Sequence, residues 1–135
     1  MQAEAFVYGK TGNSNPGDIF VHGFIVNCDG EVVSFYNKNA GWGTNMQSIY
    51  YSIIEALEST PSDITDLNIF TSQEVVVRQL RGIYHIKESK LNELHRRVMD
   101  LIEELGIRVN FQWVRKNQMM EVLAKVREEN RDLHI

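Results

Sequence analysis

The sequence lacks most features that mark disulfide-stapled, disordered or membrane-spanning chains. It has one cysteine, Cys28, so no intrachain disulfide can form, and we expect a protein of a reducing, cytoplasmic compartment. It has only two prolines, and 43% of its 135 residues are apolar, which excludes a disordered chain. No apolar run approaches the roughly 18 residues that a membrane-spanning helix needs. The first residues do not show the basic and apolar stretches of a secretory signal.

Positive charge is also scarce, and it is unevenly placed. The chain has 18 acidic and 14 basic side chains, for a formal net charge of −4. This balance excludes a strongly basic protein that binds nucleic acid indiscriminately. Residues 1–77 contain nine acids and two bases, whereas residues 78–135 contain nine acids and twelve bases. A polyanion is therefore expected to meet the second half of the chain.

The pattern of apolar residues and turn formers predicts an α/β protein with the order βββαβααβα. The predicted strands cover residues 3–9, 18–28, 31–37, 66–71 and 107–114. The predicted helices cover residues 46–59, a short segment from about Ser72 to Leu80, 90–105 and 117–129. Turn-forming residues predict loops at 10–17 and 38–43. The first three strands should pair antiparallel and the later ones parallel, in one mixed sheet.

The length fits one domain, which we place at residues 1–129. The polar residues 130–135 are predicted to form a frayed C-terminal tail.

Several short motifs are spread along nearly the whole chain in a fixed order. They are Asn15-Pro16-Gly17, Thr44-Asn45 with Tyr50, Ala56 and Leu57, the run Val76–Leu80 with Gly82 and Tyr84, the stretch Lys87–Leu91, and Trp113-Val114. In combination they resemble the type 1 ribonuclease H family. The resemblance implies a five-stranded mixed sheet of order 3-2-1-4-5 with helices on both faces.

The resemblance also implies a catalytic site, and this sequence departs from it. Members of the family cut the RNA strand of an RNA–DNA hybrid with two Mg²⁺ ions, which acidic side chains hold. At the four corresponding positions this chain has Gly9, Ile49, Ser72 and Leu123. We therefore expect no catalytic residue, no bound metal and no cofactor, and we favour a protein that is not an enzyme.

Three acids near these positions offer an alternative, namely Asp18, Glu74 and Glu121. Glu121 lies about 200° around a helix from Leu123, and so should face elsewhere. Glu74 falls in the first turn of a helix, where the helix dipole already accounts for an acid. Only if such displaced acids restored the site would Mg²⁺ be a cofactor and the chain an active hybrid ribonuclease.

Basic residues between Arg78 and Arg97 alternate with aromatic rings, in a region where the resembled family contacts the DNA strand. Thr44 and Asn45 match positions that touch the sugar-phosphate backbone in that family, although a helix N-cap would also explain them. An ordinary solvated helix face, with pairs such as Glu93 and Arg97, would explain the basic stretch equally. The candidate nucleic-acid-binding residues are Thr44, Asn45, Arg78, Arg81, Lys87, Lys90, Arg96 and Arg97.

The sequence thus predicts a catalytically degenerate ribonuclease H-like protein that binds nucleic acid, either an RNA–DNA hybrid or structured RNA or DNA. The alternative is a protein-interaction module or homodimer, in which a sheet edge or the last helix mediates association. We expect no membrane partner.

Overall fold

The computed structural model describes residues 1–133 and confirms the predicted order of elements. The strands are β1 Gln2–Thr11, β2 Gly17–Asn27, β3 Val32–Gly43, β4 Asp66–Thr71 and β5 Arg108–Trp113. The helices are α1 Asn45–Glu58, α2 Glu74–Leu80, α3 Ser89–Leu105 and α4 Lys116–Glu129, followed by a 3₁₀ turn at Arg131–Leu133. Of the predicted tail, residues 134–135 lie outside the described residues, and fraying of the remainder stays a prediction.

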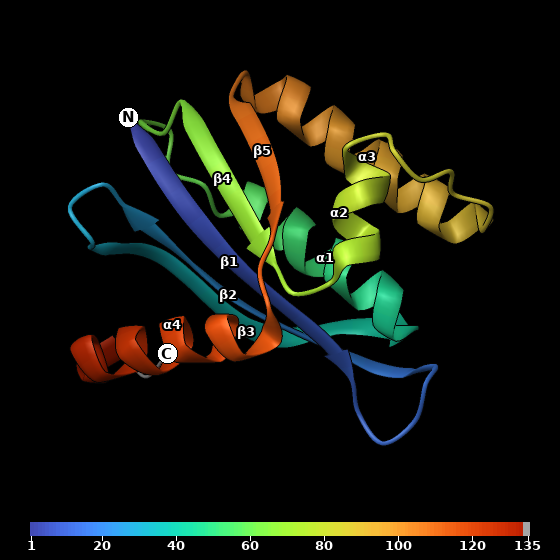
Figure 1. Cartoon of the computed structure of the whole chain (residues 1–135), viewed down its shortest axis with the longest axis horizontal. Coiled ribbons are helices and arrows are strands. Elements are labelled where there is room, and N and C mark those ends of the chain that lie inside the picture. Colours follow the sequence, from blue (N-terminus) through green and yellow to red (C-terminus); the bar gives the residue numbers. More distant parts are fainter. Residues whose placement is uncertain (134–135) are drawn as a thin grey trace.

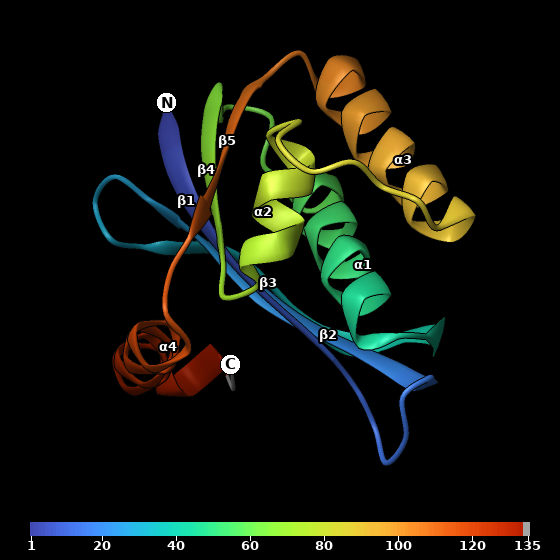
Figure 2. The same cartoon turned by 45° about the vertical axis from the view of Figure 1, so that its right-hand side comes forward.

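The five strands form one sheet of order β3-β2-β1-β4-β5, as predicted. β1, β2 and β3 pair antiparallel, while β4 pairs parallel with both β1 and β5. Helices α1, α2 and α3 cover one face, and α4 lies alone on the other (Figures 1 and 2). The two faces are therefore unequally covered, and part of the sheet beside α4 stays open.

The core divides along the same line. The larger cluster fills the space between the sheet and α1, α2 and α3. The smaller cluster lies under α4, and its buried members are Phe6, Phe24, Met119, Leu123 and Val126. Phe6 stacks on both Phe24 and Phe70, with ring centroids 5.2 and 5.0 Å apart. These few side chains anchor α4 to the sheet.

The prediction of a loop at residues 38–43 is wrong. β3 continues to Gly43, and Trp42 pairs with Asp18 at the start of β2. Glycine made this segment resemble a loop, but Gly41 has a φ of +114°, which a glycine adopts without strain, and the ladder resumes after a register shift. The Trp42 side chain is 65% exposed.

The start of α1 is built by Thr44, the N-cap. The Gln47 amide donates to Thr44 Oγ1, and the Thr44 amide donates to Gln47 Oε1, each over 3.1 Å. This reciprocal capping box satisfies two amides that the helix leaves unpaired. Among residues 1–133, no helix has the length and apolar character needed to cross a membrane.

Candidate functional site

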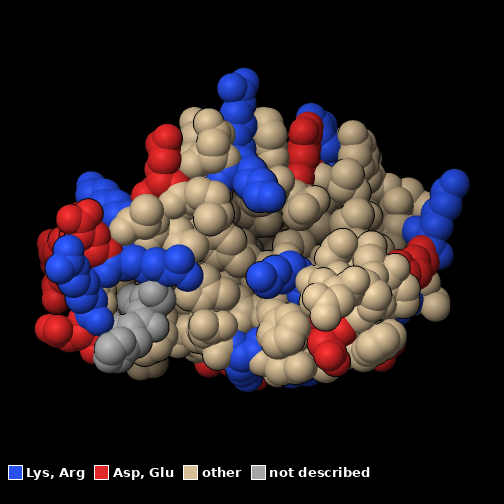
Figure 3. Space-filling model, turned by 90° about the horizontal axis from the view of Figure 1, so that it is seen from below, with Lys and Arg blue, Asp and Glu red and all other residues tan. Residues whose placement is uncertain are grey.

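The four positions that correspond to the family's metal ligands meet in space. Gly9 of β1, Ile49 of α1, Ser72 after β4 and Leu123 of α4 all line one cavity of about 650 Å³. Figure 3 views the molecule from below and shows a hollow with lysine and arginine side chains beside it. The four positions named from the sequence therefore line one cavity, and the structure shows which groups surround them.

The floor of the cavity is the open part of the sheet. Tyr8, His22 and Asn37 are neighbours across β1, β2 and β3, and Lys10 pairs with Phe20 two residues further along the strands, on the same face. Residues that pair across strands project to the same face, so these five side chains form one surface. The Tyr8 and His22 rings lie 5.6 Å apart, and Tyr8 Oη donates to the Met119 carbonyl over 2.7 Å.

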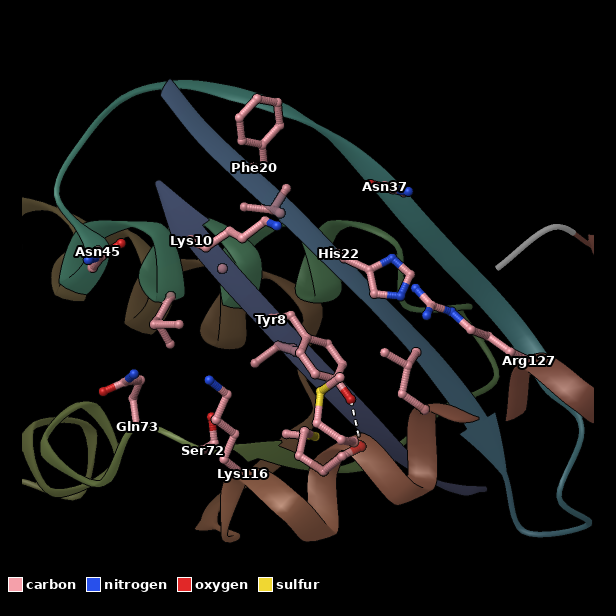
Figure 4. Close-up of a pocket in the computed structure, with 17 residues that line it drawn as sticks. Tyr8, Lys10, Phe20, His22, Asn37, Asn45, Ser72, Gln73, Lys116 and Arg127 are labelled. Carbon is pink, nitrogen blue, oxygen red and sulfur yellow. Dashed lines mark hydrogen bonds between the residues drawn. The ribbon is translucent and has the colours of Figure 1, made fainter. Parts of the chain in front are cut away.

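Two helices form the walls. One face of α4 lines the cavity, since its contributors follow the three- and four-residue spacing of a helix: Lys116, Met119, Met120, Leu123 and Arg127. On the opposite side, Asn45 and Ile49 lie one turn apart on α1. Figure 4 shows Arg127 of α4 beside His22, Lys116 near Ser72, and Asn45 at the start of α1.

No acidic side chain lines this cavity within the described part of the chain. Neither Asp18, Glu74 nor Glu121 reaches it, and Glu74 instead pairs with Arg78 over 2.9 Å. Across residues 1–133, no group of three or more His, Cys, Asp or Glu side chains is placed to hold a metal ion. The residues present therefore do not fit the two Mg²⁺ ions of the resembled family.

Gly9 adds a steric reason. A Cβ atom at this position would lie 2.8 Å from Ser48 Oγ and closer still to the Ser48 carbonyl. Helix α1 thus packs directly against the β1 backbone where the first carboxylate would stand. An aspartate cannot be added there unless the helix backbone moves.

The charge of the cavity is positive. Lys10, Lys116 and Arg127 line it and are exposed, and none of them forms an ion pair with another residue in 1–133. Burial, and then the charge of Arg127, lower the pKa of His22, so its imidazole is neutral at pH 7. Both ring nitrogens of His22 are buried, and neither has a hydrogen-bond partner of regular geometry among the described residues, although a backbone contact with Tyr36 acts against the lowering of its pKa.

Of the predicted nucleic-acid-binding residues, only Asn45 lines the cavity. Its Oδ1 accepts hydrogen bonds from the amide and hydroxyl of Thr11, over 3.0 and 2.9 Å, and so it ties α1 to β1. Thr44 is engaged in the capping box. Both therefore have structural roles at the edge of the site.

The basic residues of the second half lie elsewhere. Arg78 and Arg81 border a separate hollow of about 230 Å³ beside Trp113, and Arg81 Nε donates to the Phe111 carbonyl over 2.8 Å. Arg78 also lies 5.5 Å from the centroid of the Tyr84 ring.

On α3, Lys90 pairs with Glu93, and Arg97 pairs with Glu58 rather than with Glu93. The remaining two candidates, Lys87 and Arg96, are exposed and lie outside the main cavity. The structure does not bring these basic residues together with the emptied metal positions.

The residues that sequence reasoning missed are Lys10, His22, Lys116 and Arg127. Lys10 belongs to the acidic half, and its role depends on its pairing with Phe20 across β1 and β2. The available signal for the other two cations was their eleven-residue separation, which places Lys116 and Arg127 on one face of a helix. This helix face lines the cavity only because α4 packs with it toward the sheet, and the sequence alone does not show that packing.

The comparisons with known proteins agree with this architecture. No protein-family model matches the sequence, and no curated protein matches it either. RNase H1 from the halophilic archaeon Halobacterium salinarum matches the structure with a TM-score of 0.82 at 24% identity, over 89% of this chain and 90% of that one. An N-terminal RNase H domain from Mycobacterium tuberculosis, fused to maltose-binding protein, matches with a TM-score of 0.80 at 20% identity, over 89% and 92%.

LC11-RNase H1, isolated from compost and solved in complex with an RNA/DNA hybrid, matches with a TM-score of 0.76 at 21% identity, over 86% and 87%. The chain therefore has the ribonuclease H-like fold, as its sequence motifs predicted.

Proposed function

We propose that this chain is a catalytically degenerate relative of ribonuclease H that binds nucleic acid through the cationic cavity. One observation carries the proposal. The four positions that hold metal in the resembled family are Gly9, Ile49, Ser72 and Leu123 in this chain. They line one cavity, and cations surround it.

The charge of the site argues against hydrolysis. Two Mg²⁺ ions close together require carboxylate oxygens to offset their charge. Lys10, Lys116 and Arg127 would instead add to the positive potential and repel divalent cations. The same side chains attract phosphate, which Lys and Arg bind in most nucleic-acid interfaces. An RNA–DNA hybrid is the first ligand to test, because it is what the structurally similar LC11-RNase H1 holds.

Binding is tested by fluorescence anisotropy of a labelled hybrid, with duplex RNA and duplex DNA beside it. Lys116→Glu and Arg127→Glu should each weaken hybrid affinity by about tenfold, since each removes one phosphate contact and adds repulsion. Lys125→Glu is the matched control, because Lys125 is exposed on the same helix and does not line the cavity. Equal loss in all three variants would contradict the proposal.

Cleavage is tested separately, on the same hybrid with Mg²⁺ and with Mn²⁺. We expect no product with either metal. Turnover that disappears in Glu74→Ala or Glu121→Ala would establish displaced catalytic acids and overturn the proposal.

Self-association is the second candidate, and the edge strand β3 favours it. Along this twelve-residue strand, Val33, Phe35 and Trp42 are 39%, 44% and 65% exposed. Exposed apolar edge strands invite pairing with another chain. Sedimentation of the wild type and of Phe35→Lys distinguishes the two candidates: a monomer in both cases would exclude association through β3.

A further inference from the structure

The size of the cavity limits what can enter it. Its volume of about 650 Å³ falls within the range of roughly 300–1,000 Å³ that is typical of small-molecule sites. A space of this size can admit a single nucleotide, whereas a duplex is too wide to enter it. This inference rests on the proposed function for its site and names the unit that occupies it.

The floor supplies surfaces for an aromatic ring. Phe20 is 40% exposed, and it lies on the same face of the sheet as the Tyr8 and His22 pair, two residue pairs along the strands. Aromatic side chains on a sheet are common platforms for nucleobases, since every base has a π-face that stacks on them. The exposed Phe20 ring is the group that such a base would cover.

The rim supplies charge from separate elements. Lys10 comes from β1, Lys116 from the first turn of α4 and Arg127 from its last turn. Because no acid lines the cavity among residues 1–133, these cations are available to a phosphate, and the planar guanidinium of Arg127 can bind it through two hydrogen bonds.

His22 selects between a plain anion and a nucleotide. In the neutral imidazole one nitrogen donates and the other accepts a hydrogen bond, and both are without a partner in the described part of the chain. Figure 4 shows the Arg127 guanidinium beside this ring, so movement of Arg127 toward a phosphate would uncover it. The edge of a nucleobase offers both a donor and an acceptor, whereas a phosphate dianion offers acceptors alone.

We propose that the cavity binds a single phosphorylated nucleoside, with its base on Phe20 and against His22 and its phosphate in the positive field of Lys10, Lys116 and Arg127, which flank the cavity at separate points. The unit has two sources with the same chemistry, a free nucleoside monophosphate or the phosphorylated end of a strand.

Isothermal titration calorimetry of the full chain tests this with AMP, GMP, CMP and UMP, the four unphosphorylated nucleosides, and inorganic phosphate. We expect at least one nucleoside monophosphate to bind about tenfold or more tightly than its nucleoside and than inorganic phosphate. Equal affinity for inorganic phosphate would overturn the proposal, because the floor would then contribute nothing. Absence of binding by all four monophosphates would overturn it as well.

Two sets of variants test the part of the site that would bind the base and the part that would bind the phosphate. Phe20→Leu and His22→Gln should weaken monophosphate binding about fivefold or more while leaving the weak affinity for inorganic phosphate unchanged. Lys116→Gln and Arg127→Gln should weaken both, and Lys125→Gln should weaken neither. Circular dichroism of each variant confirms that it is folded, and loss of binding in Lys125→Gln would count against the site.

The source is separated by competition between the monophosphate and two labelled hybrids, one with 5′-phosphorylated ends and one closed at both ends by loops. Competition with the open-ended hybrid supports strand-end binding, and monophosphate binding without competition supports a free nucleotide. If the closed hybrid binds equally well and no monophosphate binds, the single-nucleotide site fails while the proposed function stands. If neither hybrid nor monophosphate binds, both fail.

Discussion

Gly9 shows at the scale of one residue why a carboxylate does not fit where β1 meets α1. The space that a side chain at position 9 would need is occupied by Ser48 of α1. We expect Gly9→Asp to lower the free energy of unfolding by about 2–3 kcal/mol, because the helix must shift to admit the new atoms. Urea denaturation measures the loss.

Gly12→Ala is the control for Gly9→Asp, since its Cβ would meet only a Phe20 ring carbon, at 3.4 Å. It should change stability little. A Gly9→Asp variant as stable as the wild type would contradict the packing described for α1.

His22 makes the stability depend on pH. Burial and the Arg127 charge hold its folded-state pKa below the ordinary value of about 6.5, so the unfolded chain binds a proton more readily than the folded one. Stability from this residue is therefore complete above about pH 6.5 and is lost as the pH falls below it. We expect the difference in unfolding free energy between about pH 7.5 and about pH 5.5 to be smaller in His22→Gln than in the wild type. An unchanged difference would contradict the burial of His22.

Single residues also show what the sequence could reveal of the site. Ile49 and Ser72 could be named from the sequence because Ile49 lies between Asn45 and Tyr50 of one motif, and Ser72 lies just before the motif that starts at Val76. Lys116 and Arg127 could not be found in this way, since neither lies in a motif and their proximity to Lys10 arises from tertiary packing.

At the scale of an element, Thr44 caps the start of helix α1. The structure gives it a capping role, whereas the sequence also allowed a phosphate contact. We expect Thr44→Ala to cost about 1 kcal/mol of stability, because the Gln47 amide loses its side-chain acceptor, while hybrid affinity stays the same. Chemical denaturation and an anisotropy titration measure the two effects.

Thr44→Ser should retain the cap and serve as the control for Thr44→Ala. A large loss of affinity with no loss of stability would restore the nucleic-acid role that the sequence suggested for Thr44.

The elements were largely predictable, and β3 shows where prediction stopped. Alternating and helical periodicities located all five strands and the helices, since each buries one face. The end of β3 has no such pattern, because Gly41 and Gly43 carry no side chain and Trp42 points to solvent. Its strand conformation comes from the ladder with β2, which lies beyond local sequence.

The distribution of charge over the whole molecule decides which surface meets a polyanion. The basic excess of residues 78–135 suggested the region of Arg78 to Arg97, but the cavity combines Lys10 from the acidic half with Lys116 and Arg127. The proposed surface therefore differs from the region that net charge along the chain indicated, since folding brings Lys10 to the same cavity as Lys116 and Arg127.

Salt dependence distinguishes these surfaces. Each phosphate contact that is lost should reduce the slope of log affinity against log salt by about 1. We expect this reduction in Lys116→Gln and no change in Arg97→Gln, whose side chain pairs with Glu58 on the far helix layer. Hybrid titrations at several salt concentrations measure the slopes, and the reverse result would place the binding surface on α3.

The contact between β1 and α1 also determines which substitution must come first if a metal site is to be engineered in this chain. A carboxylate at position 9 has no room until the backbone at Ser48 retreats, and that backbone is held by the capping box and by the bonds from Asn45 to Thr11. A carboxylate introduced at position 9 alone would destabilise the fold, and its oxygens would not be placed to bind a metal ion. Engineering of a metal site in this chain therefore has to begin with the helix.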